Sequence, residues 1–208
     1  KQAISCRRRF IVLDPCDRGV IVKNDDLTGV ILAGGKSERF GSNKAFVRFQ
    51  GRRFIDQTLA VLKELFSKLL IVTNSPEKYH NLPAMILTDE VPLQGPMGGI
   101  LTALRSVKTD GIFVVACDLP LLTRKVVQNL IRRDDGSDLV LYHHNKGLEP
   151  LCAIYRKSLL PLLKTRIRNG RLDLHSLADE ATRVKKVPLP KRDEKTLLNV
   201  NRPEDLKL

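Results

Sequence analysis

The stretch LAGGKSERFGSNK, residues 32–44, decides how the rest of the chain is interpreted. It continues an apolar run that begins at Val30, and it combines glycines with the cations Arg39 and Lys44. An apolar strand that ends in a glycine-rich, cationic loop is typical of phosphate binding, because glycines let the backbone approach the ligand and N–H groups and cations supply positive potential. The sequence therefore predicts a buried strand over residues 29–33 with a phosphate-binding loop behind it.

The spacing in this loop excludes two common nucleotide-binding motifs. A Walker A loop reads G-x-x-x-x-G-K-[ST], whereas Lys44 stands three residues after Gly41 and is followed by Ala45. The dinucleotide fingerprint G-x-G-x-x-G is also missing. We therefore do not expect a P-loop NTPase or an NAD enzyme.

The composition indicates a globular protein with one main domain. The chain has 208 residues, of which 42% are hydrophobic, enough for one α/β core. No apolar run approaches the ~18 residues that span a bilayer, and the basic N-terminus lacks the apolar core of a signal peptide. Cys117 and Cys152 lie in apolar segments and are expected to be buried thiols, so we predict a cytoplasmic protein without membrane contact.

From residue 28 onward, strand-like and helix-like segments alternate. This order predicts βαβ units, and hence a single three-layer α/β/α domain with a mainly parallel, Rossmann-like sheet. Residues 1–27 are expected to form an N-terminal extension, a short hairpin or an arm, ahead of a domain at residues 28–208. Strands are expected at residues 29–33, 69–73, 85–87, 112–116, 139–142, 151–155, 184–187 and 197–200. Helices are expected at residues 55–66, behind a glycine-rich turn at 94–99, after a cap at Thr123, at 157–166 and 173–181, and at 201–205.

Polar residues stand where four of these strands end. They are Gly34, Asn74, Asp89 and Asp118. In an open α/β sheet, ligands bind outside the carboxyl ends of the strands, so these residues are expected to share one crevice.

The chemistry available at this crevice is electrostatic. Asp118 suits Mg²⁺, although an Asp at this position also suits a helix cap. Lys44 and Arg39 suit phosphate oxygens, although either residue alone also fits a surface cation. No Ser–His–Asp or Cys–His arrangement is evident. Nucleotidyl transfer to a phosphate group requires no general base, because the attacking oxygen is already anionic.

The formal net charge of +13 indicates a polyanionic partner or a solvated basic face. Ten of the basic residues lie between residues 164 and 195. No aromatic residue interleaves with them, as a stacking single-strand binder would require, so nucleic acid is the less favoured partner.

Five segments together resemble one family. Residues 32–45, LAGGKSERFGSNKA, resemble the signature L-A-G-G-x-S-x-R-[FM]-G-x-x-K of the molybdenum cofactor guanylyltransferases, the MobA family of the nucleotide-diphospho-sugar transferase-like superfamily. Residues 94–99 are similar to its G-P-[LM]-x-G turn, and residues 117–120 to its C-D-x-P metal motif. Residues 149–155 are similar to its [QE]-P-L-x-A-[LIV]-Y segment, and residues 199–206 to its N-[VI]-N-x-P-E-[DE]-L ending.

The resemblance implies the nucleotide-diphospho-sugar transferase fold and an Mg²⁺-dependent transfer of GMP. GTP and molybdenum-bound molybdopterin would give the guanine dinucleotide cofactor and pyrophosphate. Molybdoenzyme chaperones or other cofactor-biosynthesis proteins would be the protein partners. The implied catalytic residues are Asp118, Lys44 and Arg39, with Asp118 as metal ligand. The implied GTP contacts are Leu32, Ala33, Gly34, Gly35, Lys44, Asn74, Asp89 and Asp118, and the implied contacts to the second substrate are Gly95, Gly98, Asn199 and Asn201.

Gly34 bears on which base is accepted. Sibling cytidylyltransferases typically carry L-A-A-G where this chain has L-A-G-G, and the missing side chain leaves room for a purine. Phe40 and Arg202 depart from the commoner Met and Thr of the pattern, and residues 1–27 have no counterpart in the minimal domain. Two alternatives stay open: a cytidylyl or sugar-phosphate nucleotidyltransferase of the same fold, and a non-catalytic nucleotide or nucleic-acid binding protein.

Overall fold

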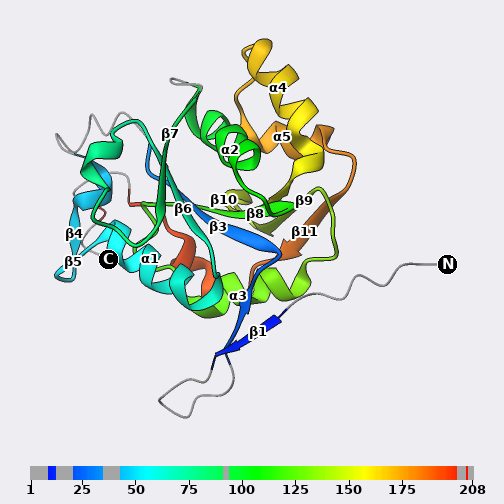
Figure 1. The fold of residues 1–208 in the computed structure, drawn as a ribbon. Helices are drawn as coiled ribbons and strands as arrows, with labels where there is room; N and C mark the ends of the chain where they lie inside the picture. Colours follow the sequence, from blue (N-terminus) through cyan, green and yellow to red (C-terminus); the bar gives the residue numbers. More distant parts are fainter. Residues whose placement is uncertain (1–8, 13–20, 35–42, 91–93, 201–204, 206–208) are drawn as a thin grey trace.

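The computed structural model describes residues 9–12, 21–34, 43–90, 94–200 and 205. Its centre is a seven-stranded sheet in the order β11-β9-β10-β8-β3-β6-β7 (Figure 1). The strands are β3 (Leu27–Leu32), β6 (Leu69–Thr73), β7 (Met85–Thr88), β8 (Gly111–Ala116), β9 (Leu139–His144), β10 (Gly147–Arg156) and β11 (Val184–Pro188). The central sheet confirms the predicted fold class.

The two most apolar strands lie next to each other in the sheet. Every residue of β3 and of β8 is buried, as expected for strands covered on both faces. They pair in parallel with Val30 opposite Val114, and β6 and β7 continue the parallel arrangement. Only β10 runs antiparallel to its two neighbours in this sheet, so the sheet is mainly parallel, as predicted.

Helices cover both faces of the sheet. In Figure 1, α1 (Phe54–Leu65) and α3 (Arg124–Arg133) lie on one face. The opposite face carries α2 (Gly95–Ser106), α4 (Leu160–Arg168) and α5 (Leu174–Glu180). Side chains alternate along β3, so Ile31 packs under α1 and α3 whereas Val30 and Leu32 pack under α2. None of the helices among the described residues is long and apolar enough to cross a bilayer.

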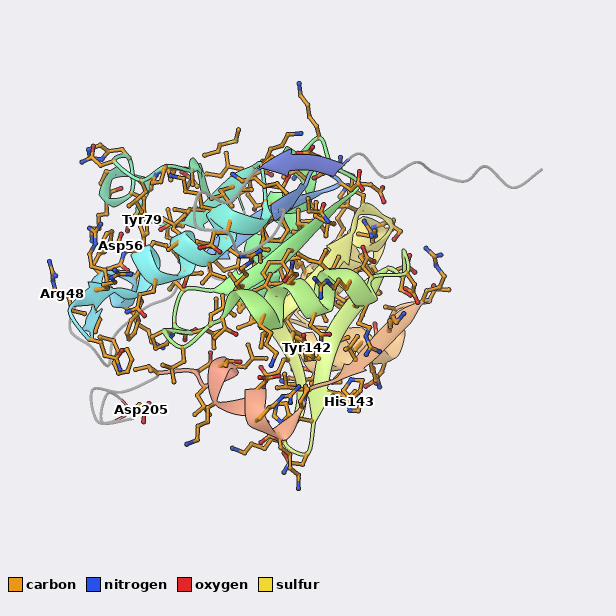
Figure 2. The ribbon with its side chains drawn as sticks, turned by 90° about the horizontal axis from the view of Figure 1, so that it is seen from below. Arg48, Asp56, Tyr79, Tyr142, His143 and Asp205 are labelled. Carbon is orange, nitrogen blue, oxygen red and sulfur yellow. The ribbon has the colours of Figure 1, made fainter. Side chains whose placement is uncertain are left out.

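The predicted cap of α3 is present. The Thr123 side chain accepts a hydrogen bond from the backbone N–H of Val126 at 3.5 Å. From beneath the helix, the Tyr142 hydroxyl donates to the Val126 carbonyl at 2.8 Å and accepts from Asn129 at 2.9 Å (Figure 2). These contacts fix the helix on β9.

Two sequence predictions were wrong in their local structure. The glycine-rich segment 94–99 is not a separate turn, because α2 begins at Gly95, where Pro96 fits a first helical turn and leaves no donor unpaired. Residues 197–200 do not form a strand. The segment ends a 3-10 helix, η5 (Lys191–Leu197), and then crosses the ends of the strands, where the Val200 N–H donates to the Asp118 carbonyl at 3.0 Å.

The remaining described elements are short. In the N-terminal segment, for which a short hairpin or an arm was expected, β1 (Arg9–Val12) pairs antiparallel with β2 (Ile21–Asn24) in a sheet of its own. The short apolar segment 46–49 divides between the 3-10 helix η2 (Lys44–Phe46) and β4 (Arg48–Phe49), which pairs with β5 (Arg52–Arg53). Two further 3-10 helices are η3 (Pro76–Lys78) and η4 (Lys157–Leu159). The predicted last helix lies outside the described residues except for Asp205.

Candidate functional site

The carboxyl ends of four neighbouring strands carry the predicted site residues. Gly34, Asn74, Asp89 and Asp118 follow β3, β6, β7 and β8, which are adjacent in the sheet. Backbone hydrogen bonds continue past the strand ends, from Ala33 N–H to the Val72 carbonyl at 2.9 Å and from Cys117 N–H to the Leu32 carbonyl at 3.2 Å. The four positions therefore lie along one edge of the sheet.

Lys44 and Asp118 meet across this edge. The Lys44 Nζ lies 2.6 Å from Asp118 Oδ2, and the two side chains are only 14% and 19% exposed. Lys44 begins η2 while Asp118 follows β8, so the contact joins the segment after the phosphate loop to the middle of the sheet. Because little water surrounds this ion pair, its two charges attract each other more strongly than those of an exposed pair on the surface.

The second oxygen of Asp118 is buried and has no hydrogen-bond partner in the described part of the chain. Asp118 Oδ1 is inaccessible to solvent and accepts no hydrogen bond from any residue the structure describes. Burying a carboxylate oxygen without a hydrogen-bond donor costs free energy unless a bound ligand supplies the missing contact. Mg²⁺ is commonly held by one or two carboxylates together with substrate phosphates, so this oxygen fits such an ion. Within the described ranges, no group of three or more His, Cys, Asp or Glu residues could hold a metal on its own.

The Asp118 neighbour Cys117 contributes no charge. Burial, and to a smaller extent the adjacent Asp118 carboxylate, raises the pKa of its thiol to about 12. Cys117 and Cys152 are both free and buried, as predicted.

Tyr79 fixes the backbone at the end of β3. Its hydroxyl lies 3.1 Å from Asn43 Oδ1 and 3.3 Å from the Ala33 carbonyl, and Thr73 Oγ1 donates to the same carbonyl at 3.2 Å. Asn43 Oδ1 also accepts the N–H of Ala45 at 3.1 Å and caps η2, which holds Lys44. Burial raises the pKa of Tyr79, so the phenol remains a neutral donor. Sequence reasoning missed Tyr79, because a tyrosine in a polar stretch gives no motif.

Two further contacts position predicted ligand residues. Asp89 Oδ1 accepts a hydrogen bond from the buried Thr102 hydroxyl on α2 at 3.0 Å, and that hydroxyl accepts the Glu90 N–H at 3.1 Å. A Cβ added to Gly34 would lie 3.5 Å from Asn74 Nδ2, so these two residues are neighbours.

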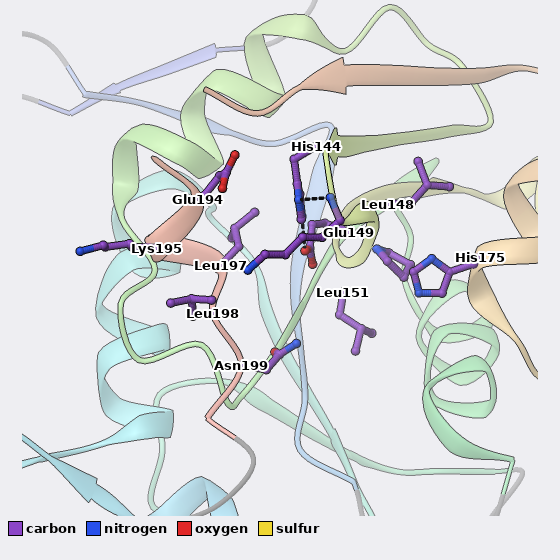
Figure 3. A pocket seen from close by; sticks show the side chains of 12 residues that line it. His144, Leu148, Glu149, Leu151, His175, Glu194, Lys195, Leu197, Leu198 and Asn199 are labelled. Atoms are coloured by element: carbon purple, nitrogen blue, oxygen red, sulfur yellow. Dashed lines mark hydrogen bonds and ion pairs between the residues drawn. The ribbon is translucent and has the colours of Figure 1, made fainter. Parts of the chain in front are cut away.

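A pocket of about 570 Å³ adjoins the Asp118 side of the edge (Figure 3). Asn199 lines it and precedes Val200, whose N–H binds the Asp118 carbonyl. His144 and Glu149 also line it, with 2.7 Å between His144 Nε2 and Glu149 Oε1. Its other lining residues are Lys146, Leu148, Pro150, Leu151, His175, Glu194, Lys195, Leu197 and Leu198.

The remaining predicted residues are distributed as follows. Gly95 and Gly98 lie in the first turn of α2, β3 ends at Leu32, and Ala33 directly follows it. Gly35, Arg39 and Asn201 lie outside the described residues.

Known proteins resemble this chain in both sequence and fold. The family model of the MobA-like NTP transferase domain matches residues 29–184. A protein of Carboxydothermus hydrogenoformans named "Probable molybdenum cofactor guanylyltransferase" is 35% identical over 185 residues, which cover 86% of this chain and 93% of that protein. A "Molybdenum cofactor guanylyltransferase" of Desulfosudis oleivorans is 37% identical over 150 residues, 71% of this chain and 74% of that one. The solved structure of molybdopterin-guanine dinucleotide biosynthesis protein A from Archaeoglobus fulgidus has a TM-score of 0.72 at 25% identity, covering 87% of this chain and 95% of that one.

Proposed function

The chain belongs to the MobA-like NTP transferase family and is a nucleotidyltransferase, and from this membership we propose that it is a molybdenum cofactor guanylyltransferase. It transfers GMP from GTP to the phosphate of molybdenum-bound molybdopterin. A phosphate oxygen of the acceptor forms a bond to the α-phosphorus of GTP, and the bond from that phosphorus to the β-phosphate bridging oxygen breaks. The products are the guanine dinucleotide cofactor and pyrophosphate.

The observation that carries this proposal is the Lys44–Asp118 pair with its unpartnered carboxylate oxygen. In the structure, Lys44 Nζ lies 2.6 Å from Asp118 Oδ2. GTP brings phosphate oxygens that are better partners for the ammonium, so Lys44 moves from Asp118 to the nucleotide. The same movement leaves both oxygens of Asp118 available, and Arg39 supplies a second cation from the loop.

Asp118 is the residue that would hold Mg²⁺. Its Oδ1 is buried without a hydrogen bond among the described residues, which fits an ion held between protein and phosphates. When bound, Mg²⁺ neutralises charge on the α-phosphate and on the leaving pyrophosphate. Lys44 would stabilise the same developing charge, and such positioning and electrostatics account for most catalysis of this class.

The proposed nucleotide contacts lie along the same edge of the sheet, and the proposed acceptor pocket adjoins it. Leu32, Ala33, Gly34, Gly35, Asn74 and Asp89 contact GTP, while the pocket beside Asn199 takes the second substrate together with Asn201, Gly95 and Gly98. The acceptor phosphate is anionic and attacks without a general base. Residues 28–208 form the transferase domain in this proposal, with residues 1–27 as an extension. The free thiols of Cys117 and Cys152 are consistent with work in the reducing cytoplasm.

The test measures which nucleotide enters the product. The chain is incubated with molybdenum-loaded molybdopterin, Mg²⁺ and GTP, CTP or UTP, and pyrophosphate release and product mass are recorded. We expect GMP transfer and a loss of turnover of at least ~10²-fold in Asp118→Asn, a magnitude typical of removing a main electrostatic stabiliser.

Two outcomes would refute parts of the proposal. Transfer of CMP or UMP in preference to GMP would favour the alternative transferases of the same fold. Near-normal turnover in Asp118→Asn would show that Asp118 does not hold the metal during the reaction. Glu77→Gln, an exposed carboxylate on η3, is the matched control and should behave as the unmodified chain.

A further inference from the structure

The segment that begins at Glu149 resembles a family motif, yet the proposed reaction assigns it no role. Glu149 lies on β10 at the edge of the pocket, opposite Tyr142 in the β9–β10 ladder. The pairing then shifts between Glu149 and Ala153, so residues 150–152 bulge out of the ladder. Bulges redirect side chains beside functional sites, and this one lies at the wall of the pocket.

The bulge is held from inside the core. The Tyr155 hydroxyl is fully buried and donates to the Pro150 carbonyl at 2.8 Å. This contact fixes the backbone next to Glu149, so the direction of that side chain is set by packed structure.

His144 then fixes the Glu149 carboxylate. The His144 side chain is 9% exposed, and its Nδ1 accepts the backbone N–H of Lys146 at 3.1 Å. An Nδ1 that accepts carries no proton, so the neutral ring carries its proton on Nε2 and donates it to Glu149 Oε1 at 2.7 Å. The Nδ1 contact with Lys146 holds the His144 ring in place, and Nε2 then holds the Glu149 carboxylate (Figure 3).

The carboxylate keeps further acceptor capacity. A carboxylate has about four lone-pair sites, and His144 is the hydrogen-bond partner of Glu149 among the residues the structure describes. Five of the twelve residues that line the pocket are leucine or proline, Leu148, Pro150, Leu151, Leu197 and Leu198, and the others include the charged Lys146, Glu194 and Lys195. A fixed carboxylate beside these apolar side chains suits a flat heterocycle that presents two adjacent N–H donors.

We propose that Glu149, positioned by His144, recognises the 2-amino-4-oxopyrimidine edge of the acceptor's pterin. This inference rests on the proposed function for the identity of the acceptor. That edge carries an exocyclic amino group beside a ring N–H, and both donate in parallel to one carboxylate. The motif also allows glutamine, whose amide offers one acceptor and one donor, so the double-acceptor match is particular to a chain with Glu149.

The test compares two fluorescent ligands that differ only at this edge. 6-Hydroxymethylpterin carries the amino group, whereas 6-hydroxymethyllumazine has a carbonyl oxygen in its place and would face the carboxylate with an acceptor. We expect the full chain to prefer the pterin by about 10-fold or more, the range of a hydrogen bond to a charged group. Glu149→Gln should reduce that preference to about 3-fold or less, with GTP affinity unchanged.

Variants of His144 separate positioning from general damage. His144→Phe keeps the ring volume but removes the donor, so it should lower the pterin preference. His144→Gln offers an amide N–H near the position of Nε2 and should restore most of the preference. In a Glu149→Gln background, His144→Phe should change the preference no further, because the carboxylate it orients is gone.

The outcomes distinguish this inference from the proposed function. Equal pterin preference in the unmodified chain and Glu149→Gln overturns the inference, even if GMP transfer is observed. If neither analogue binds, KM for molybdenum-loaded molybdopterin decides, and an unchanged KM in Glu149→Gln overturns it. A change in GTP affinity instead would assign Glu149 to the nucleotide. Selective pterin binding without transfer from any nucleotide would leave the inference standing and refute the function.

Discussion

Gly34 is the residue whose missing side chain bears most directly on base choice. A Cβ built there would lie 3.5 Å from Asn74 Nδ2 and 3.9 Å from the Asn74 backbone nitrogen, ordinary contact distances. The protein itself therefore tolerates Gly34→Ala, and any penalty falls on the ligand. We expect GTP affinity to fall by about 10-fold and CTP affinity to change by less, since steric exclusion of this size is worth ~1–3 kcal/mol.

Calorimetric titration of GTP and CTP against Gly34→Ala checks this expectation, with thermal unfolding as the control for folding. Equal losses for both nucleotides would mean that the Cβ acts on the shared phosphates or ribose. A large drop in melting temperature would mean that the space around Gly34 is less open than its neighbours indicate.

At this scale the sequence was informative where a motif carried the chemistry. Lys44 and Asp118 were predicted from spacing and resemblance, and the structure brings them to 2.6 Å. Tyr79, Thr102 and His144 were not predicted as site residues. Each acts by a hydrogen bond to a partner at least five residues away in the chain, and no local pattern encodes such a pair. The same holds for the buried Asp118 Oδ1, since burial of one atom depends on the whole fold.

Among the elements, the start of β9 is tied to two neighbours through Asp138. Asp138 Oδ1 accepts from Ser158 Oγ at 2.7 Å and from Arg183 Nη2 at 3.0 Å, and Oδ2 accepts the Arg183 N–H at 3.1 Å. The hydrogen bond from Ser158, together with the Arg183 guanidinium, lowers the pKa of this carboxyl below its usual range. The ionised carboxylate thus joins the start of β9 to η4 and to the residue before β11.

We expect Asp138→Asn to lower the free energy of unfolding by about 1–3 kcal/mol at pH 7, the size of hydrogen bonds to a charged group. A folded-state pKa below the unfolded value stabilises the protein above pH ~4, and this contribution is lost as the pH falls through the folded pKa. Urea unfolding of both proteins at pH 7, 5, 4 and 3 should therefore give curves that converge only in the acidic range. A difference that is constant with pH would indicate a packing effect instead of ionisation.

The elements also show which signals in the sequence were sufficient. Strands β3 and β8 were predicted because continuous apolar runs are typical of buried parallel strands. Residues 197–200 have similar apolar character, but Leu197 and Val200 pack into the core from a segment that crosses the strand ends. A segment of four residues is too short for its apolar pattern to distinguish these two arrangements.

On the scale of the whole molecule, the net charge of +13 is partly neutralised where it is densest. Between residues 164 and 195, Arg166 and Arg171 pair with Glu180, Arg183 with Asp138 and Lys185 with Asp135. Arg166 is 2% exposed at its side chain and also binds the Asp173 carbonyl and Ser176 within the α4–α5 unit. Several of the cations that suggested a nucleic-acid surface are therefore used to join elements of the fold.

The remaining excess charge should act on the polyanionic substrates at long range. Raising the salt from about 50 to about 200 mM shortens the Debye length from about 14 to 7 Å, which weakens the attraction between this chain and GTP before contact. We expect kcat/KM for GTP to fall several-fold over that range while kcat stays nearly constant, because the charges at Asp118 and Lys44 are shielded from solvent. Steady-state kinetics at four salt concentrations measure both constants.

Parallel titration with single-stranded RNA tests the nucleic-acid alternative. Tight RNA binding that falls steeply with salt and is unaffected by Asp118→Asn would mean that the basic surface binds nucleic acid. The steep fall is expected in that case because counterion release scales with the number of phosphates neutralised.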